Sequence, residues 1–205
     1  MSFDKEAQNW DQNQERVDRA KVFAEEILSF IKPEKEMTAM EFGSGTGLLS
    51  EQMKDHFQSI SLVDTSEGMI KVLKEKIAEK QLSNFHPFLT DLTKDPFSKK
   101  NIDVIYTSMT LHHIINLNQI LGVFNSLLNK NGYLCIADLE KEDGTFHSGD
   151  GFEGHFGFDK EELTGLLSKN GFRVVYYTRP ITLKKEREGI VKDFPLFLMI
   201  AQKIN

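Results

Sequence analysis

The stretch that decides the fold is MEFGSGTGLLS, residues 40–50, in which Gly43, Gly45 and Gly47 stand at alternate positions close behind Glu41. The segment 37–42 predicts a short buried strand, and residues 47–57 predict a helix that begins inside the loop. Glycine lets a ligand lie against main-chain N–H groups with no Cβ in the way. One glycine suffices for a turn, so three favour a bound ligand over a bare strand-to-helix turn.

Strands and helices alternate on both sides of this loop. Helices are predicted at 16–31, where Pro33 ends the helix, at 67–81, at 116–132, where Gly132 ends the helix, and at 159–171. Strands are predicted at 37–42, 59–64, 85–89, 101–109, 133–139, 172–181 and 194–203. The last two strands are joined by a polar segment, 182–193, without a convincing helix, so we expect an antiparallel pair. The pattern predicts an α/β fold with a seven-stranded, mostly parallel sheet and helices on both faces.

Length and composition limit the organisation and the partners. A chain of 205 residues predicts one domain, 1–205, with a helical segment 1–32, a core 33–139, a glycine-rich loop 140–158, and a final helix and strand pair 159–205. The net charge of −6 argues against nucleic acid as a partner. No apolar run approaches a membrane span and no secretory signal is visible, so we expect no membrane partner. The single cysteine, Cys135, favours a cytoplasmic protein.

The spacing of the glycines separates two classes of cofactor. Dinucleotide-binding loops read G-x-G-x-x-G and place a pyrophosphate on a helix N-terminus, whereas this loop reads G-x-G-x-G. Glu41 would repel a pyrophosphate, but it would favour a ligand that carries a sulfonium and an ammonium group. The loop therefore indicates S-adenosyl-L-methionine, and a nicotinamide-dependent oxidoreductase is the alternative.

The motifs together resemble the class I S-adenosylmethionine-dependent methyltransferase family, of the small-molecule type. The segment EFGSGTG is similar to the family's first motif, E/D-x-G-x-G-x-G, and Asp64 matches the acid that grips the ribose hydroxyls. Segments 90–92 and 102–114 resemble the adenine-binding and methionine-binding motifs. Segment 128–139 is similar to the next motif, but Lys130 and Asn131 replace its proline and first glycine. The resemblance implies a Rossmann-like fold and methyl transfer to a small-molecule acceptor, with release of S-adenosylhomocysteine.

The resemblance also implies which residues hold the cofactor. These are Glu41, Gly43, Ser44, Gly45, Gly47, Asp64, Thr65, Met69, Asp91, Leu92, Ser108 and Met109. Simpler alternatives stay open for three of them: Glu41 could be an ordinary charge at a strand end, Asp64 could cap a helix, and Asp91 could be a turn acid. Family members often fold an N-terminal segment over the cofactor as a lid, and Trp10 lies in the matching segment here. A non-catalytic protein that binds S-adenosylmethionine is a further alternative.

Four histidines bear on the reaction. His112 and His113 follow the fourth strand, and His147 and His155 lie in the glycine-rich loop, so all four are expected near one edge of the sheet. Imidazole can accept a proton at neutral pH, and we predict His113, His147 and His155 as catalytic residues near the acceptor. Adjacent histidines rarely bind one ion together, and no tight ligand spacing is present, so we predict no metal. We expect a monomer or a homodimer.

Overall fold

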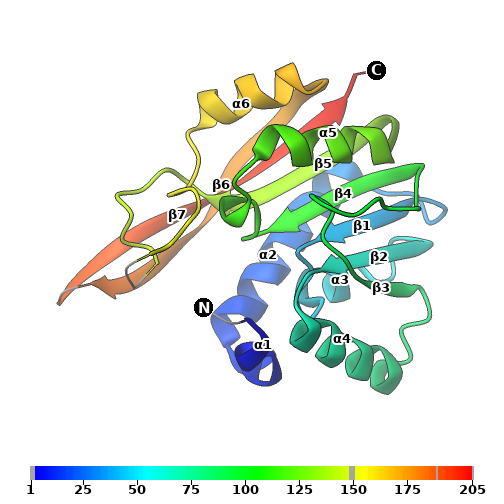
Figure 1. The fold of residues 1–205 in the computed structure, drawn as a ribbon, viewed down its shortest axis with the longest axis horizontal. Coiled ribbons are helices and arrows are strands. Elements are labelled where there is room, and N and C mark those ends of the chain that lie inside the picture. Colours follow the sequence, from blue (N-terminus) through cyan, green and yellow to red (C-terminus); the bar gives the residue numbers. More distant parts are fainter. Residues whose placement is uncertain (1–2, 148–150, 188, 205) are drawn as a thin grey trace.

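The computed structural model describes residues 3–147, 151–187 and 189–204, and its core is one seven-stranded sheet in the order β3-β2-β1-β4-β5-β7-β6 (Figure 1). The strands are β1 (Thr38–Phe42), β2 (Ser59–Asp64), β3 (Phe85–Leu89), β4 (Ile102–Ser108), β5 (Leu128–Leu139), β6 (Phe172–Arg187) and β7 (Ile190–Lys203). Strands β1 to β5 pair in parallel, and β7 runs antiparallel to both β5 and β6. The predicted fold class is confirmed.

Side-chain caps set where several helices begin. The helices are α1 (Phe3–Glu6), η1 (Ala7–Gln12), α2 (Gln14–Ile31), α3 (Leu48–Met53), α4 (Glu67–Lys80), η2 (Leu111–His113), α5 (Leu117–Leu127) and α6 (Lys160–Lys169). The side chain of Asn13 caps α2, Ser66 caps α4 and Asp159 caps α6, each by accepting from a backbone N–H of the first turn. Helix α2 ends at Ile31, two residues before Pro33, as predicted.

The helices divide between the two faces of the sheet because alternate strand residues point to opposite sides. Ala39, Leu62 and Tyr106 belong to the hydrophobic cluster that contains α2, α3 and α4. Their neighbours Met40 and Val63 belong to the cluster that contains α5 and α6. Both faces are thus covered, and the loops that leave the carboxyl ends of the parallel strands share one edge.

The prediction that Gly132 ends a helix was wrong. Helix α5 stops at Leu127, and β5 begins at Leu128 and runs through Gly132. A Cβ at Gly132 would lie 3.0 Å from the carbonyl oxygens of Asn129 and Asp103, so this glycine permits a close approach of backbones. The positive φ that a helix-ending glycine would supply is instead taken by Asn131, at 64°.

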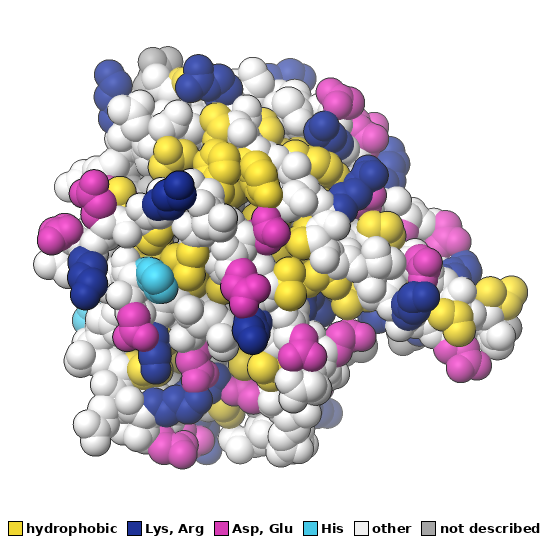
Figure 2. All heavy atoms as spheres, turned by 180° about the vertical axis from the view of Figure 1, so that it is seen from behind, with side chains coloured by type: hydrophobic (Ala, Val, Ile, Leu, Met, Phe, Trp, Pro, Cys, Tyr) yellow, Lys and Arg dark blue, Asp and Glu magenta, His cyan; other side chains and the backbone are white. Residues whose placement is uncertain are grey.

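The polar segment 182–193 is not a loop, because β6 and β7 continue through it to Arg187 and Ile190 as one long hairpin (Figure 1). Seen from behind, the projecting hairpin carries charges of both signs and hydrophobic atoms at its far end (Figure 2). The strands could not be predicted here because charged side chains replace the apolar alternation that is typical of a strand. Among the described residues from 182 to 194, Leu183 and Phe194 are the only buried ones.

Residues 143–146 of the glycine-rich loop lie against this hairpin. Arg187 donates from Nε to the carbonyl oxygen of Thr145 and from Nη2 to that of Phe146, each at 2.6 Å. Lys192 pairs with Asp143 at 2.8 Å. The hairpin is therefore the support for the loop that carries His147.

Among the helices in the described part of the chain, none combines the length and the apolar character that crossing a bilayer requires.

Candidate functional site at the carboxyl edge of the sheet

The glycine loop is folded back over the end of β2. Backbone N–H groups of Gly43 and Ser44 both donate to the carbonyl oxygen of Val63, at 2.8 and 3.0 Å. All three glycines have positive φ, at 68°, 52° and 77° for Gly43, Gly45 and Gly47. This backbone path disfavours any other residue type.

The three glycines have different surroundings. A Cβ at Gly43 would lie 2.3 Å from the side chain of Thr110, and one at Gly47 would lie 2.9 Å from Leu73. Packing within the protein therefore accounts for these two. A Cβ at Gly45 would make only ordinary contacts, at 3.8 Å to Met69 Sδ and 3.9 Å to Nε1 of Trp10. Gly45 is the position at which the loop leaves room for a ligand.

Asp64, at the end of β2, ties the loop to the next helix. Its Oδ2 accepts from the N–H of Gly45 at 2.7 Å, and its Oδ1 accepts from the N–H of Ser66 at 2.8 Å. Burial raises the pKa of this carboxyl, against the opposing effect of the N–H donors. Thr65 follows on the exposed side and Met69 is buried beneath the loop. Asp64 is thus held in place, with each carboxylate oxygen keeping acceptor capacity.

Glu41 lies beneath the loop and is 3% exposed. Its Oε2 accepts from the hydroxyl of Ser50 at 2.5 Å, and that hydroxyl also lies 2.6 Å from the hydroxyl of Tyr106. Burial raises the pKa of Glu41 to about 8, so the carboxyl is mainly protonated at pH 7. In the loop that follows β1, the buried hydroxyl of Ser44 has no hydrogen-bond partner within the described ranges.

The N-terminal segment covers the glycine loop. Oδ1 of Asp4 accepts from the Ser66 hydroxyl at 2.6 Å and from the N–H of Gly68 at 2.9 Å, which fastens α1 to the start of α4. The carboxylate of Asp11 bonds the Thr46 hydroxyl at 2.5 Å and pairs with Lys76 at 2.6 Å. Trp10 lies beside Gly45, and Arg16 stacks on its ring at 3.5 Å.

In the segment predicted to hold adenine, Asp91 forms hydrogen bonds and an ion pair within its own turn. Oδ1 of Asp91 accepts from the N–H and the hydroxyl of Thr93, and its Oδ2 pairs with Lys94 at 2.7 Å. Burial raises the pKa of Asp91, but these bonds outweigh burial and lower it overall. Leu92 is buried in the core. The turn-acid alternative thus accounts for every bond of Asp91 in the structure, and its contact with adenine stays a prediction.

The segment after β4 joins the glycine loop to the histidines. Ser108 ends the strand, and Met109 has a φ of 54° and donates its N–H to the carbonyl oxygen of Ala137. The hydroxyl of Thr110 donates to the carbonyl oxygen of Ser108 at 3.0 Å, and its methyl side packs on Gly43. The short helix η2, which follows at once, carries the histidine pair.

Three histidines form one cluster, which we call the histidine cluster: His112, His113 and His147. Ring centroids lie 4.1 Å apart for His112 and His113, 5.1 Å for His112 and His147, and 5.4 Å for His113 and His147. One ring nitrogen from each of the three lies within 4.8 Å of the others. Nδ1 of His112 lies 2.6 Å from Oδ1 of Asp138, and both residues are buried.

The two outer rings of the cluster are neutral at pH 7. Burial, with His112 as the next cause, lowers the pKa of His113 to about 4 and that of His147 to about 4. Nε2 of His147 is buried without a hydrogen-bond partner among the residues that the structure describes. Phe152 stacks on His147 at 3.9 Å, and Phe3 meets His113 edge-on at 5.6 Å. The cluster is therefore enclosed by aromatic rings.

The structure thus brings His113 and His147 together, and it adds His112, which we did not predict as catalytic. His155 is apart from them: its Nε2 bonds the carbonyl oxygen of Ile114 at 3.0 Å, and it lines a separate hollow of about 280 Å³ beside Ile115. The sequence signal for His112 was its place in the histidine pair. Its partner Asp138 stands in an apolar strand, where a buried acid normally has a partner.

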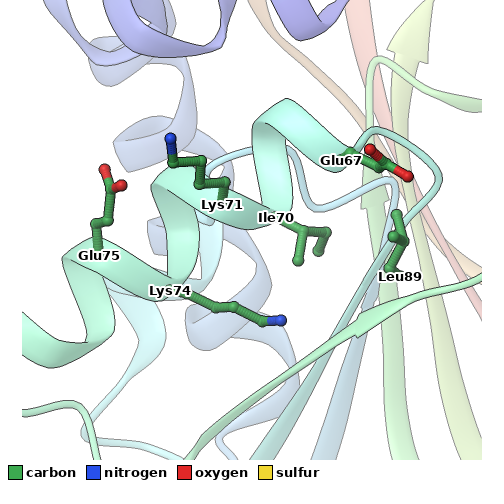
Figure 3. A pocket seen from close by; sticks show the side chains of 6 residues that line it. All are labelled: Glu67, Ile70, Lys71, Lys74, Glu75 and Leu89. Carbon is green, nitrogen blue, oxygen red and sulfur yellow. The ribbon is translucent and has the colours of Figure 1, made fainter.

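A second hollow, of about 450 Å³, lies on the outer side of α4, where Ile70 and Leu89 point toward each other (Figure 3). Lys71 and Glu75 also line this hollow and are exposed. None of the predicted cofactor residues lines this hollow.

Known proteins share both the sequence and the fold. Residues 13–177 match a family described as "Methyltransferase domain". An uncharacterized methyltransferase of Schizosaccharomyces pombe is 31% identical over 144 residues, which are 66% of this chain and 48% of that protein. The chain thus spans about half of that relative. One of Geobacillus sp. is 27% identical over 194 residues, which are 85% of this chain and 89% of that protein.

A solved structure shows the same fold. A S-adenosylmethionine-dependent methyltransferase from Clostridium acetobutylicum superposes with a TM-score of 0.73 at 13% identity and covers 100% of both chains. The cofactor is S-adenosyl-L-methionine, as predicted, so the nicotinamide alternative is not supported. The chain belongs to the methyltransferase domain family and is a class I S-adenosylmethionine-dependent methyltransferase.

Proposed function

We propose that this protein transfers a methyl group from S-adenosylmethionine to a small-molecule acceptor that binds between the glycine loop and the histidine cluster. The observation that carries the proposal is an aromatic bridge across the two sites. Phe3 lies 6.0 Å from Trp10, which is beside Gly45, and 5.6 Å from His113. A donor at the loop and an acceptor at the cluster would therefore be neighbours.

The residues on the cofactor side fit S-adenosylmethionine. Gly45 leaves an open face, the buried Ser44 hydroxyl lacks a partner within the described ranges, and Asp64 offers a held carboxylate to ribose hydroxyls. The carboxylate of Asp64 makes the pocket favourable for a cation, whereas Glu41 is buried beneath the loop and mainly protonated at pH 7. Segment 3–13 is proposed as the lid of the pocket. When bound, the cofactor supplies an activated methyl group on a sulfonium. The remaining predicted cofactor residues, Gly43, Gly47, Thr65, Met69, Asp91, Leu92, Ser108 and Met109, stay predictions.

The acceptor side of the protein orients the acceptor and excludes water. A neutral imidazole can accept a hydrogen bond from a hydroxyl, amine or thiol, and the rings of Phe3 and Phe152 shield His113 and His147. With a pKa near 4 these rings are weak bases at pH 7, so alignment of the acceptor is the larger part of their contribution. His155, beside its own hollow, is proposed to contact a more distant part of the acceptor.

Three organisational expectations also stay proposals. The buried thiol of Cys135 supports a cytoplasmic location. The negative net charge supports a small-molecule acceptor rather than nucleic acid. A monomer or a homodimer is expected, and sedimentation of the purified protein distinguishes them.

The cofactor assignment is tested by calorimetric titration with S-adenosylmethionine and S-adenosylhomocysteine. We expect Asp64→Asn to weaken binding by about 10- to 100-fold, because one charge-assisted hydrogen bond is worth about 1.5–3 kcal/mol. Asp55→Asn removes an exposed charge of the same kind and serves as the control. If the wild-type protein bound neither adenosyl compound, the proposal would fail.

The acceptor assignment is tested by following S-adenosylhomocysteine release with panels of phenols, amines and thiols. We expect turnover with members of one panel, and a loss of about 10²-fold or more in His113→Ala. Binding of S-adenosylmethionine without turnover on any acceptor, including proteins and nucleic acids, would instead favour the non-catalytic alternative. Turnover on a protein or a nucleic acid would overturn the small-molecule proposal.

A further inference from the structure

The histidine cluster has the composition of a metal site. Three imidazoles, from His112, His113 and His147, place one ring nitrogen each within 4.8 Å of the others. A tetrahedral ion with metal–nitrogen bonds of about 2.0–2.1 Å sets its ligand nitrogens about 3.3 Å apart. The side chains would therefore need to close by at most about 1.5 Å, which is within the reach of side-chain rotation.

The surroundings of His112 are those of a ligand that is oriented for a metal. Oδ1 of Asp138 lies 2.6 Å from Nδ1 of His112, and the Oδ2 of the same carboxylate accepts the His112 backbone N–H at 3.3 Å. A carboxylate on one ring nitrogen fixes the tautomer and leaves Nε2 with its lone pair for an ion. Asp138 is fully buried and lies on β5, so the strand holds the ring in place.

The third proposed ligand, His147, comes from the loop after β5, and its Nε2 needs a partner. Nε2 of His147 is buried and lacks a hydrogen-bond partner in the ranges 3–147, 151–187 and 189–204. A buried polar atom of this kind costs free energy unless a partner binds it. The stacked ring of Phe152 and the bonds of Arg187 to the loop backbone hold His147 against the cluster. A bound cation would satisfy this nitrogen.

We propose that His112, His113 and His147 bind one divalent transition-metal ion of the zinc class, oriented by Asp138. Imidazole nitrogen is the ligand type that zinc, cobalt, nickel and iron share, whereas magnesium and calcium prefer oxygen. Three protein ligands leave a fourth position open, as in catalytic zinc sites. This proposal departs from the expectation from sequence that adjacent histidines would not bind one metal, and it does so because η2 brings their rings to 4.1 Å.

The open position gives the ion a role in the reaction. An oxygen, nitrogen or sulfur atom of the acceptor would bind there instead of donating a hydrogen bond to an imidazole, whose lone pair then binds the ion. The acceptor would release its proton to solvent more readily, because a bound cation lowers the pKa of its ligands. This role rests on the proposed function, but binding of the ion does not. The two claims can therefore fail separately.

Metal binding is tested on the full-length protein after treatment with a chelator and exchange into metal-free buffer. Zn²⁺ is titrated by calorimetry, and Co²⁺ by its visible absorption, which reports the coordination directly. We expect one equivalent of each ion and no binding of Mg²⁺. Each of His113→Ala and His147→Ala should weaken Zn²⁺ binding by at least about 100-fold, since even loss of an outer partner of a metal ligand costs about 10- to 100-fold.

His56→Ala is the matched control, because His56 is an exposed histidine outside the cluster. Circular dichroism of each variant checks the fold. His113 and His147 are chosen because His112 on η2 and Asp138 on β5 are fully buried, so their replacement would disturb the fold. The inference is overturned if neither ion binds the wild-type protein at micromolar concentration. It is also overturned if binding survives both cluster substitutions or disappears with His56→Ala.

Titration with S-adenosylmethionine before and after chelation separates the two proposals. Cofactor binding and turnover that persist without any metal binding would remove the metal site and leave the proposed function standing. Stoichiometric metal binding in a protein that shows no methyl transfer would leave the metal site standing and remove the proposed function.

Discussion

The glycine loop and the histidine cluster share one edge of the sheet, yet they are built in different ways. Most bonds that hold the loop lie within the unit formed by β1, α3 and β2, such as those of Gly45 with Asp64 and of Gly43 with Val63. The cluster takes its histidines from η2 and from the loop after β5, and its support from Asp138 and Arg187. One side is the product of a single strand–helix–strand unit, and the other is assembled by the whole fold.

The two regions also differ in charge. The loop side holds the carboxylate of Asp64, which suits a cationic ligand, above the buried and mainly protonated Glu41. The cluster side offers the neutral imidazoles of His113 and His147, and Asp138 is the acid that pairs with His112. A cationic methyl donor would thus lie beside an acid, and a proton-bearing acceptor would lie beside neutral imidazoles. The predictions below disturb one region and ask whether the other responds.

The largest expected effect is the response of stability to pH in Glu41→Gln. The pKa of Glu41 in the folded protein is about 8, above its ordinary value of 4.5, so the folded state keeps a proton that the unfolded chain releases. This contribution to stability is complete below pH 4.5 and is lost as pH rises through 8. Between these pH values the free energy of unfolding of the wild-type protein should fall by on the order of 4 kcal/mol relative to that of Glu41→Gln.

Urea unfolding at pH 5 and at pH 8.5 measures this difference. The control is Glu51→Gln, because Lys80 and Lys76 lower the pKa of Glu51 against the effect of its burial. Its contribution is present above pH 4.5 and is lost as pH falls, which is the opposite sign. Parallel pH profiles for the two variants would contradict the buried, protonated state of Glu41.

Gly43→Ala should destabilise the protein by about 4 kcal/mol. The added Cβ would combine a positive φ, which costs about 1–2 kcal/mol, with overpacking against Thr110 at 2.3 Å, which costs about 1–3 kcal/mol. Gly45→Ala carries the strain of its φ without the clash and should cost about 1 kcal/mol. Urea unfolding gives both values, and equal losses would show that the glycines have the same role.

Arg187→Ala should separate the two regions. It releases the backbone of Thr145 and Phe146, and so loosens His147, but it touches nothing at the glycine loop in the contacts that the structure records. We expect the rate of methyl transfer to fall by about 10- to 100-fold, since a misplaced reacting group costs about that much, with the Kd for S-adenosylmethionine unchanged.

Arg173→Ala is the matched control on the same strand, because Arg173 bonds only the side chain of Gln202 in the described structure. Turnover assays and calorimetric titration of both variants give the answer. A weaker Kd in Arg187→Ala would show that the loop and the cluster are coupled.

The smallest expected effect is that of Trp10→Ala. Loss of the ring beside Gly45 should weaken S-adenosylmethionine binding by about three- to tenfold, which corresponds to about 1 kcal/mol of aromatic contact. Trp10 is the only tryptophan, so its fluorescence in the wild-type protein reports cofactor binding directly. Phe156→Ala removes an exposed ring elsewhere and should leave binding unchanged. An unchanged affinity in Trp10→Ala would argue against the lid.

Local patterns determined most of the fold. The predicted strands 59–64 and 85–89 agree with the observed β2 and β3 to the residue, because each combines an apolar run with a clear turn signal. The prediction failed at Gly132 and at segment 182–193, where long-range pairing outweighed local preference. A strand rich in Lys, Glu and Arg is stable here because β6 and β7 pair along their whole length.

The sequence by itself determined the architecture and the cofactor, because the alternation of strands and helices and the spacing within the glycine loop are local patterns that are visible in the chain. Only the tertiary structure decided that Glu41 is buried under the loop rather than aimed at open solvent, and that His112 joins His113 and His147 while His155 does not. The physical reason is that these features depend on contacts between residues far apart in the sequence. Burial, ring orientation and the approach of residue 147 to residue 112 depend on how separate elements pack, and no local pattern encodes that packing.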